Sequence, residues 1–268
     1  MNKTIAIAGL GWLGLSFAQR LMMLGYSVKG SVTTAKKAAS LKTKGFDAYA
    51  VEISEQGVSG QTQDFLKDAD VLAIMIPPGI RRNTGADFVQ KMSHFLKEIE
   101  NSEVKKIILV SSTSVYGDAQ GEVNESDLPI PDAESGRQLF QVEQLFYNST
   151  SFKTAIVRFG GLIGASRQPV KYLAGRKDLN GGNAPVNLIH REDCIGILLE
   201  IIRKDAFSQF YNAVAPQHPI KKEYYTQKAK EMDLAPPNFA EENPEENYKT
   251  VHSKNLDGIL GYRFLKEI

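Results

Sequence analysis

The sequence contains a single cysteine, Cys194, among its 268 residues. One thiol cannot close an internal disulfide, and no second thiol is present to help build a zinc site. Scarce cysteine is typical of proteins that work in a reducing compartment. We therefore expect a cytoplasmic protein with no metal site.

The sequence also shows no excess of positive or negative charge, and it contains no long apolar run. Lys and Arg number 32 against 31 Asp and Glu, so no basic surface is predicted for nucleic acid or for an anionic membrane. No apolar run approaches the roughly 18 residues that cross a bilayer. Lys3 precedes an apolar run, but glycines interrupt that run and no small-residue cleavage site follows, which argues against a secretory signal. The expected partners are small molecules or other proteins.

What the sequence does contain is a regular alternation of strand and helix patterns. Apolar, β-branched runs predict strands at 4–9, 26–32, 47–53, 70–77, 105–112 and 154–161. Helical spacing of apolar residues predicts helices at 15–25, 36–45, 86–101 and 137–149. Strands that are apolar nearly throughout are typical of a parallel sheet covered on both faces. The prediction is an α/β protein with a Rossmann-like, doubly wound parallel sheet.

The alternation breaks after about residue 163. A stretch rich in Gly, Asn and Pro follows, and then a helix is predicted at 191–204 and a short strand at 210–216. We expect a Rossmann domain over 1–165 and a small C-terminal substrate lobe over 166–268. Within that lobe, residues 186–215 are expected to pack back on the Rossmann core.

The first predicted strand runs directly into the sequence GLGWLG. In such a loop Gly9 permits a tight turn, Gly11 lets the backbone approach a pyrophosphate, and Gly14 lets helix and strand pack closely. Backbone N–H groups at the start of the helix then face the anion. We predict that this loop, including Trp12 and Leu13, binds a dinucleotide. The alternative is a glycine-rich turn without a ligand.

An acid that would bind an adenosine ribose is missing. It is expected about 20 residues after the loop, yet residues 15–46 contain no Asp or Glu. The end of the second strand instead carries Thr33, Thr34 and Lys36, whose hydroxyl and ammonium groups would donate to a 2′-phosphate. This pattern favours NADP(H) over NAD(H). The alternative is that Lys36 and the lysine after it form only the solvated first turn of a helix.

Three motifs in order carry a family resemblance: GLGWLG, then VSSTSVYG at 110–117, then NLIHREDCIGILLE at 187–200. Together they resemble the short-chain dehydrogenase/reductase superfamily, in its extended and atypical branch of NAD(P)-dependent epimerases and dehydratases. The resemblance covers residues 1–215. It implies a nicotinamide cofactor and a small-molecule substrate, such as a nucleotide sugar or another small alcohol or ketone. A homodimer through the helix at 137–149 fits its apolar residues, and so does core packing.

The superfamily's catalytic pair is not found. Its members carry a Tyr and, four residues later, a Lys, followed after four more residues by a Glu on the same helix. Aligned on Glu143, these positions hold Ser135 and Leu139. No Tyr occurs between residues 117 and 146 and no Lys between 115 and 152, so no shift of the alignment restores the pair. A serine hydroxyl has too high a pKa to replace a tuned tyrosine.

Two hydroxyl groups are the remaining catalytic candidates. The resemblance implies that Ser112, four residues before the Tyr of the VYG element, holds a substrate oxygen. Tyr116 itself is the candidate substitute acid, and the alternative is a tyrosine used for packing. The resemblance also points to further cofactor contacts along the carboxyl edge of the sheet: Glu52, Pro77, Pro78, Ser111, Phe159 and Gly160.

Two more residues have open roles. His190 precedes a helix in a motif that, by the resemblance, pins the lobe to the sheet, so a structural role stands beside proton transfer. Arg158 pairs either with Asp193 or with a substrate phosphate. Two readings of function follow: an NADP(H)-dependent enzyme of the epimerase, dehydratase or reductase type with altered acid–base residues, or a noncatalytic NADP(H) sensor or scaffold protein.

Overall fold

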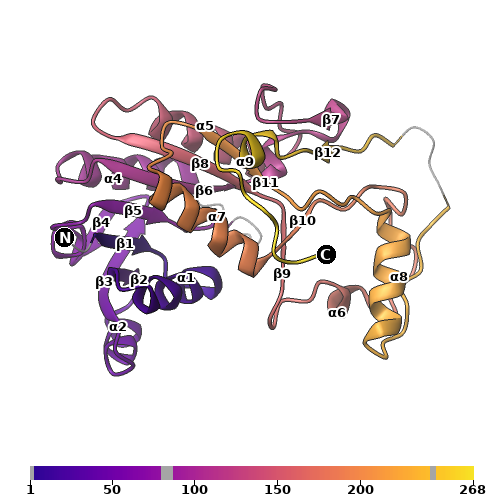
Figure 1. Cartoon of the computed structure of the whole chain (residues 1–268), viewed down its shortest axis with the longest axis horizontal. Coiled ribbons are helices and arrows are strands. Elements are labelled where there is room, and N and C mark those ends of the chain that lie inside the picture. The colour runs from indigo at the N-terminus through magenta and orange to yellow at the C-terminus, as the bar shows by residue number, and fades with distance from the viewer. Residues whose placement is uncertain (1–2, 80–86, 242–245) are drawn as a thin grey trace.

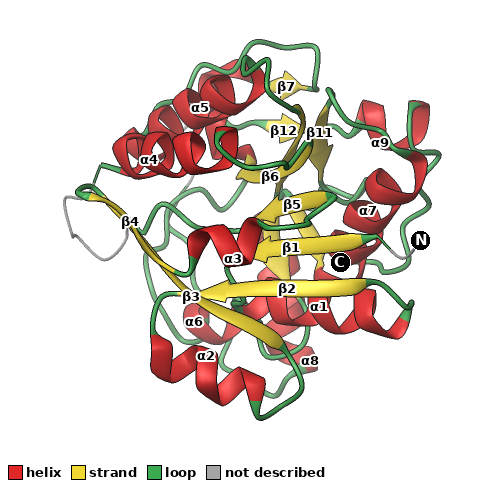
Figure 2. Cartoon of the chain, turned by 90° about the vertical axis from the view of Figure 1, so that its left-hand side faces the viewer, coloured by secondary structure: helices red, strands yellow, loops and turns green. Residues whose placement is uncertain are grey.

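The computed structural model describes residues 3–79, 87–241 and 246–268. Its centre is a sheet of eight strands in the order β11-β8-β6-β5-β1-β2-β3-β4, seen with its covering helices in Figures 1 and 2. All neighbours in it pair in parallel except β3 and β4. The strands are β1 (Thr4–Ala8), β2 (Ser27–Val32), β3 (Asp47–Ser54), β4 (Gly57–Gly60), β5 (Val71–Ile74), β6 (Lys106–Ser112), β8 (Lys153–Phe159) and β11 (Phe210–Ala213).

Helices cover both faces of this sheet, as predicted for a doubly wound fold. On one face, α1 (Trp12–Met23) and α7 (Arg191–Lys204) share a core cluster with the apolar side chains of β1 and β8, and the short α2 (Ala35–Lys42) adds to it. On the other face, α4 (Phe88–Glu100) and α5 (Glu134–Tyr147) pack together with α3 (Thr62–Leu66) over a second cluster. The predicted Rossmann-like fold is confirmed.

The hairpin of β3 and β4 was not predicted. Its strands pair antiparallel, from Val51 opposite Gly60 to Ser54 opposite Gly57. Gly60 has φ +96°, and a Cβ there would lie 2.2 Å from the carbonyl oxygen of Ala50. Only glycine fits such a position. Strand β4, with the sequence GVSG, has too few apolar residues to reveal itself by alternation.

The lobe has a small core of its own. Strands β9 (Gly161–Ile163) and β10 (Leu188–His190) pair in parallel, and the helices α6 (Val170–Leu173) and α8 (Lys221–Glu231) contact each other. Figure 1 places α6 and α8 at one end of the molecule, away from the sheet. Only Tyr225 and Ala229 of α8 are buried, which is why its polar sequence gave no helical pattern.

The C-terminal segment returns to the Rossmann core. Strand β12 (Thr250–Val251) pairs with β7 (Glu122–Val123), and α9 (Lys254–Gly258) packs against β11. Leu256, Leu260 and Tyr262 belong to the same core cluster as α1 and α7. Residues 186–215 include α7 and β11, which both lie on the core, so the expected lobe of 166–268 contributes two segments to the Rossmann unit. Among the described residues, no helix is long and apolar enough to span a bilayer.

Candidate functional site

The glycine loop lies at the carboxyl edge of the sheet, between β1 and α1. Gly9 has φ +105°, and a Cβ there would lie 3.0 Å from the carbonyl oxygen of Met75. A Cβ at Gly14 would lie only 2.2 Å from the carbonyl oxygen of Gly9, so loop and helix meet backbone to backbone. Beside Gly11, in contrast, a Cβ would meet nothing within 4 Å. The two outer glycines thus shape the turn, and the middle one leaves open space.

The helix that begins at this loop offers donors for an anion. Gly11 is the N-cap of α1 and supplies no side-chain hydrogen bond, and the first turn holds no acidic residue. The first N–H groups of a helix lack intrahelical partners, and the helix dipole adds positive potential there. The backbone at Trp12 and Leu13 therefore fits a pyrophosphate, while the Leu13 side chain packs into the core.

The end of β2 is fastened to the same loop. The Leu10 N–H donates to the carbonyl oxygen of Ser31 at 2.9 Å, and a Cβ on Gly30 would lie 2.3 Å from the Leu10 side chain. The next residues, Thr33 and Thr34, are exposed. This contact fastens the end of β2, which Thr33 and Thr34 follow, to the glycine loop.

Helix α2 begins immediately after these hydroxyl groups. Thr34 is its N-cap, and the Thr34 Oγ1 accepts from the Lys37 N–H at 3.3 Å. Lys36 lies exposed in the first turn. The structure thus fits both sequence readings, a helix start and a cationic rim beside the loop.

The other expected cofactor contacts occupy varied positions along the sheet edge. Glu52 is exposed on β3, opposite Ser59 of the hairpin. Pro77 and Pro78 follow β5 and lead to Gly79, after which residues 80–86 lie outside the described part of the chain. These positions are compatible with the expected contacts and remain predictions.

Strand β8 ends beside the segment that leads into β10. Phe159 is its last residue and is buried in the core, so only its backbone faces the edge. A Cβ on Gly160 would lie 2.6 Å from the carbonyl oxygen of Asn187. The glycine is therefore needed for the close approach of these two segments, whatever it contacts in a ligand.

Two serines close β6 at the same edge. The Ser111 side chain is buried, and its Oγ has no hydrogen-bond partner among the described residues. The Ser112 Oγ accepts from the Ser114 N–H at 3.2 Å, which caps a short 3-10 turn, Thr113–Val115. Ser112 is half-buried, and its own hydroxyl proton remains available to a ligand oxygen.

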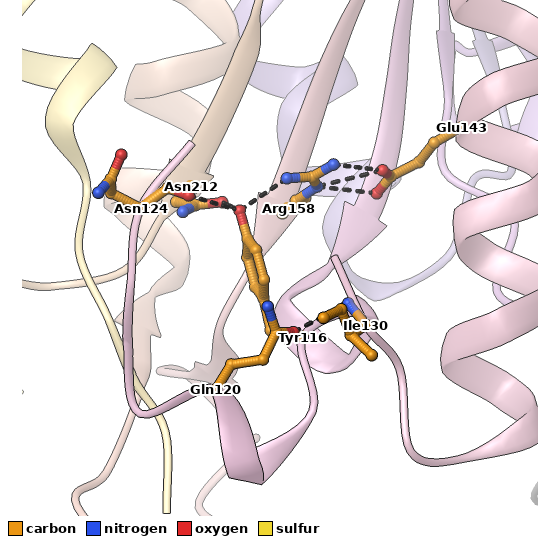
Figure 3. A network of polar contacts seen from close by, with 7 residues as sticks. All are labelled: Tyr116, Gln120, Asn124, Ile130, Glu143, Arg158 and Asn212. Carbon is orange, nitrogen blue, oxygen red and sulfur yellow. Dashed lines mark hydrogen bonds and ion pairs between the residues drawn. The ribbon is translucent and has the colours of Figure 1, made fainter. Parts of the chain in front are cut away.

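Tyr116 does not face this edge freely. Its side chain is fully buried, and its hydroxyl lies within hydrogen-bond distance of the Asn124 carbonyl oxygen (3.0 Å), Asn212 Oδ1 (3.2 Å) and Arg158 Nη1 (2.7 Å), as Figure 3 shows. Burial raises the pKa of the phenol, against the opposing influence of the Arg158 charge. These contacts support the packing alternative. Proton exchange with a substrate would require the hydroxyl to leave all three partners.

Arg158 pairs with neither of the partners considered from the sequence. Its guanidinium forms a bidentate ion pair with Glu143 of α5, in which Nη2 donates to Oε2 at 2.7 Å and Nε lies 3.1 Å from both carboxylate oxygens, while its remaining branch donates to Tyr116. Both charged side chains are almost completely buried. Burial lowers the pKa of Arg158, and the Glu143 carboxylate more than offsets this, so the net shift is upward. The expected pairing with Asp193 or a substrate phosphate is wrong, because α5 supplies a nearer acid.

Asp193 fastens the C-terminal segment instead. It is fully buried, and its Oδ1 accepts from the Tyr262 hydroxyl at 3.0 Å and from the Leu265 N–H at 2.6 Å. At the start of the same helix, the His190 Nδ1 accepts from the Glu192 N–H at 3.2 Å. A Cβ on Gly164 would lie 2.5 Å from His190 Nε2, so the ring packs against the lobe's first loop. These contacts support the structural role of His190.

The positions of α5 that align with the missing catalytic pair carry no acid or base. Ser135 is half-buried and Leu139 is buried on α5. Between them, a Cβ on Gly136 would lie 2.3 Å from the Ser114 carbonyl oxygen. No ammonium group stands at position 139, so nothing there would lower the pKa of a neighbouring hydroxyl.

Sequence reasoning missed Lys249. Its Nζ donates to the carbonyl oxygen of Tyr116 and pairs with Asp118 at 3.0 Å. The two segments are separated by more than a hundred residues, so no local pattern could link them. In the described part of the chain, no group of three or more His, Cys, Asp or Glu side chains is arranged to hold a metal ion.

Comparisons with known proteins agree with this geometry. A family model described as the NAD binding domain of 6-phosphogluconate dehydrogenase matches residues 4–126. Protein YeeZ of Escherichia coli strain K12 is 34% identical over 265 residues, covering 98% of this chain and 96% of YeeZ.

Solved structures show the same fold at lower identity. A functionally unknown conserved protein from Silicibacter pomeroyi has a TM-score of 0.79 at 20% identity, covering 98% of this chain and 94% of that one. MoeE5, solved in complex with UDP-glucuronic acid and NAD, has a TM-score of 0.79 at 17% identity, with 99% and 95% covered. At these identities the likeness establishes the architecture and leaves the ligands of this chain to be argued from its own residues.

Proposed function

Because the chain belongs to the family of Escherichia coli protein YeeZ and has the fold of the short-chain dehydrogenase/reductase superfamily, we propose that it binds NADP(H) at the glycine loop. The observation that carries the proposal is the shape of that loop. Gly9 and Gly14 are locked against backbone atoms, while the space beside Gly11 at the start of α1 is open. That is the arrangement a pyrophosphate needs.

The choice of NADP(H) rests on the neighbouring strand. The end of β2 is held against the loop by the Leu10–Ser31 hydrogen bond, and its exposed residues carry hydroxyl and ammonium groups. No carboxylate follows in the chain until Asp47. A 2′-phosphate would meet donors there, and an unmodified ribose would lack its usual acidic acceptor.

The chemistry we propose is that of an epimerase, dehydratase or reductase acting on a nucleotide sugar or another small alcohol or ketone. The bound dinucleotide would supply or accept hydride. Ser112 would hold the reacting oxygen through its hydroxyl proton, at the carboxyl edge where α/β proteins bind ligands. Because Tyr116 is enclosed by Arg158 and Asn212, the proton would be exchanged with water.

A noncatalytic NADP(H) sensor is the second candidate. The observation that favours it is the loss of both partners of the catalytic pair, with Ser135 and Leu139 at their positions on α5. The retained Ser112 hydroxyl at the carboxyl edge of the sheet favours the enzyme.

Deuterium transfer separates the two candidates. Protein incubated with NADPH deuterated at nicotinamide C4 and a panel of UDP-ketosugars, whose carbonyl carbon can accept the hydride, should yield deuterated alcohol product if it is an enzyme. The rate should fall at least about tenfold in Ser112→Ala. NADPH binding without transfer to any substrate would favour the sensor, and an unchanged rate in Ser112→Ala would remove that hydroxyl from the mechanism.

A further inference from the structure

Two arginines converge on the only tryptophan of the chain. The guanidinium carbon of Arg191 lies 5.3 Å from the centre of the Trp12 ring, and that of Arg167 lies 5.7 Å from it. Trp12 is the first residue of α1, directly after Gly11. Both cations therefore stand beside the residue whose backbone opens the proposed pyrophosphate site.

Neither guanidinium has a close carboxylate partner among the described residues. Arg167 is exposed and forms no ion pair or side-chain hydrogen bond within the described ranges. Arg191 has one distant pairing, 3.7 Å from Glu192, and its Nε is buried with no hydrogen-bond partner in the described part of the chain. Buried donors are normally satisfied. Two guanidinium groups that share one aromatic ring in place of a carboxylate also repel each other.

Both arginines are held in place by the backbone. Arg167 closes a tight turn after β9, in which Gly164 and Arg167 exchange backbone hydrogen bonds of 3.0 Å in both directions. Ala165 within it has φ +48°, a conformation that a non-glycine residue adopts only when its surroundings impose it. Arg191 begins α7, which packs against α1. Lobe and core thus each present one guanidinium to Trp12.

We propose that Arg167 and Arg191 form a clamp for a diphosphate group, with Trp12 as its platform. The inference rests on the proposed function, because it places the clamp at the mouth of the same loop. Guanidinium groups suit a diphosphate through their planar, bidentate donors. The diphosphate has two sources, the dinucleotide cofactor and a nucleotide-sugar substrate, and in either case the clamp couples the lobe to the bound ligand.

Trp12 provides a direct readout, since no other tryptophan contributes to the fluorescence. Inorganic pyrophosphate, NADPH and UDP are titrated separately into the full-length protein, and emission is followed beside calorimetry. Pyrophosphate should change the emission saturably in the wild type and should not do so in Arg167→Gln/Arg191→Gln. Arg263→Gln is the matched control, because it removes an exposed arginine whose one ion pair in the described part of the chain is with Asp257, at 3.7 Å.

The affinities assign the source of the diphosphate. If the clamp holds the cofactor, Arg167→Gln should weaken NADPH binding at least tenfold and leave UDP binding unchanged. If it holds the substrate, Arg167→Gln should weaken UDP binding and leave NADPH binding unchanged. Arg167→Lys keeps the charge and loses the planar guanidinium, so its affinity for the ligand should lie between those of the wild type and Arg167→Gln. Arg167 is exposed, so its single variants keep the test valid where the double variant does not fold.

Failure of the clamp and failure of the proposed function are distinguishable. Normal binding of NADPH, UDP and pyrophosphate by both Arg167→Gln and the folded double variant would overturn the clamp and leave cofactor binding intact. Absence of NADPH binding by the wild type would overturn the proposed function. If Arg263→Gln weakened ligand binding as much as Arg167→Gln does, the clamp would also be overturned, because the effect would then come from the overall charge.

Discussion

At the scale of single residues, the glycines of the loop divide into two kinds that the sequence cannot tell apart. All three fit the same spacing, yet an added Cβ at Gly14 would strike the Gly9 carbonyl oxygen and one at Gly11 would enter open space. Gly11 also has an ordinary φ of −89°. Gly14 therefore serves the fold, and Gly11 is free to serve a ligand.

This difference gives a matched pair of variants. Gly14→Ala should lower the free energy of unfolding by about 1–3 kcal/mol, since helix and loop must move apart. Gly11→Ala should change it by about 0.5 kcal/mol or less, as at an ordinary surface position. Urea unfolding measures both. Equal losses of stability in the two variants would mean that the space beside Gly11 is not open.

Lys36 and Lys37 carry the predicted cofactor preference. Replacing both by Glu puts carboxylates where the 2′-phosphate would lie. This should weaken NADPH binding at least about tenfold and change NADH binding much less. Parallel titrations of the two dinucleotides check this. Equal weakening of both would return these lysines to the alternative reading, the solvated first turn of α2.

The ion pair between Glu143 and Arg158 gives a prediction about stability. Both side chains are almost completely buried, so Glu143→Gln leaves an unpaired guanidinium in the core. We expect a loss of about 3–5 kcal/mol in the free energy of unfolding. The control is Glu134→Gln, which removes an exposed partner of Arg137 on the same helix and should leave the unfolding curve unchanged. A small loss at Glu143 would contradict the network of Figure 3.

At the scale of elements, the sequence predicts segments with strong periodicity and misses those held by distant contacts. Helix α7 has eight buried residues at helical spacing and was predicted with its correct bounds. Helix α8 buries two side chains and was missed. The short strands β7 and β12 exist only because they pair across 128 residues of chain, from Glu122 to Thr250, and no local pattern records such a pairing.

Two histidine rings lie side by side close to strand β12. The rings of His218 and His252 lie 5.4 Å apart, and the His218 Nδ1 lies 3.1 Å from the Val186 carbonyl oxygen. Burial lowers the pKa of His218, the nearby His252 lowers it further, and the hydrogen bond to Val186 and the Glu122 carboxylate oppose these effects. The unfolded chain then binds a proton at His218 more readily than the folded protein does.

Stability should therefore fall as pH falls below about 6.5, where the unfolded histidine takes up its proton. His218→Asn removes this difference, so its melting temperature should decline less steeply than that of the wild type between about pH 6.5 and 5. Thermal unfolding across that range provides the measurement. Parallel curves for the two proteins would exclude His218 as the source.

At the scale of the whole molecule, the parallel sheet with helices on both faces, and the glycine loop after its first strand, could be predicted because they follow from local patterns. The surroundings of the catalytic candidates could not. Tyr116 lies in a motif that suggests chemistry, and the partners of its hydroxyl come from β8, β11 and the residue that follows β7. Arg167 and Trp12 are 155 positions apart, and only the packing of lobe on core brings them together.

The central claim is that the open loop at Gly11 binds a phosphorylated dinucleotide. Calorimetric titration of nucleotide-free protein with NADPH, NADP⁺, NADH and NAD⁺ tests it most directly, with Gly11→Ala as the folded control. We predict micromolar binding of NADPH and NADP⁺, at least tenfold tighter than their unphosphorylated counterparts, or about 1.4 kcal/mol, with both lost in Gly11→Ala. No heat with any of the four, or binding that Gly11→Ala leaves unchanged, would contradict the account.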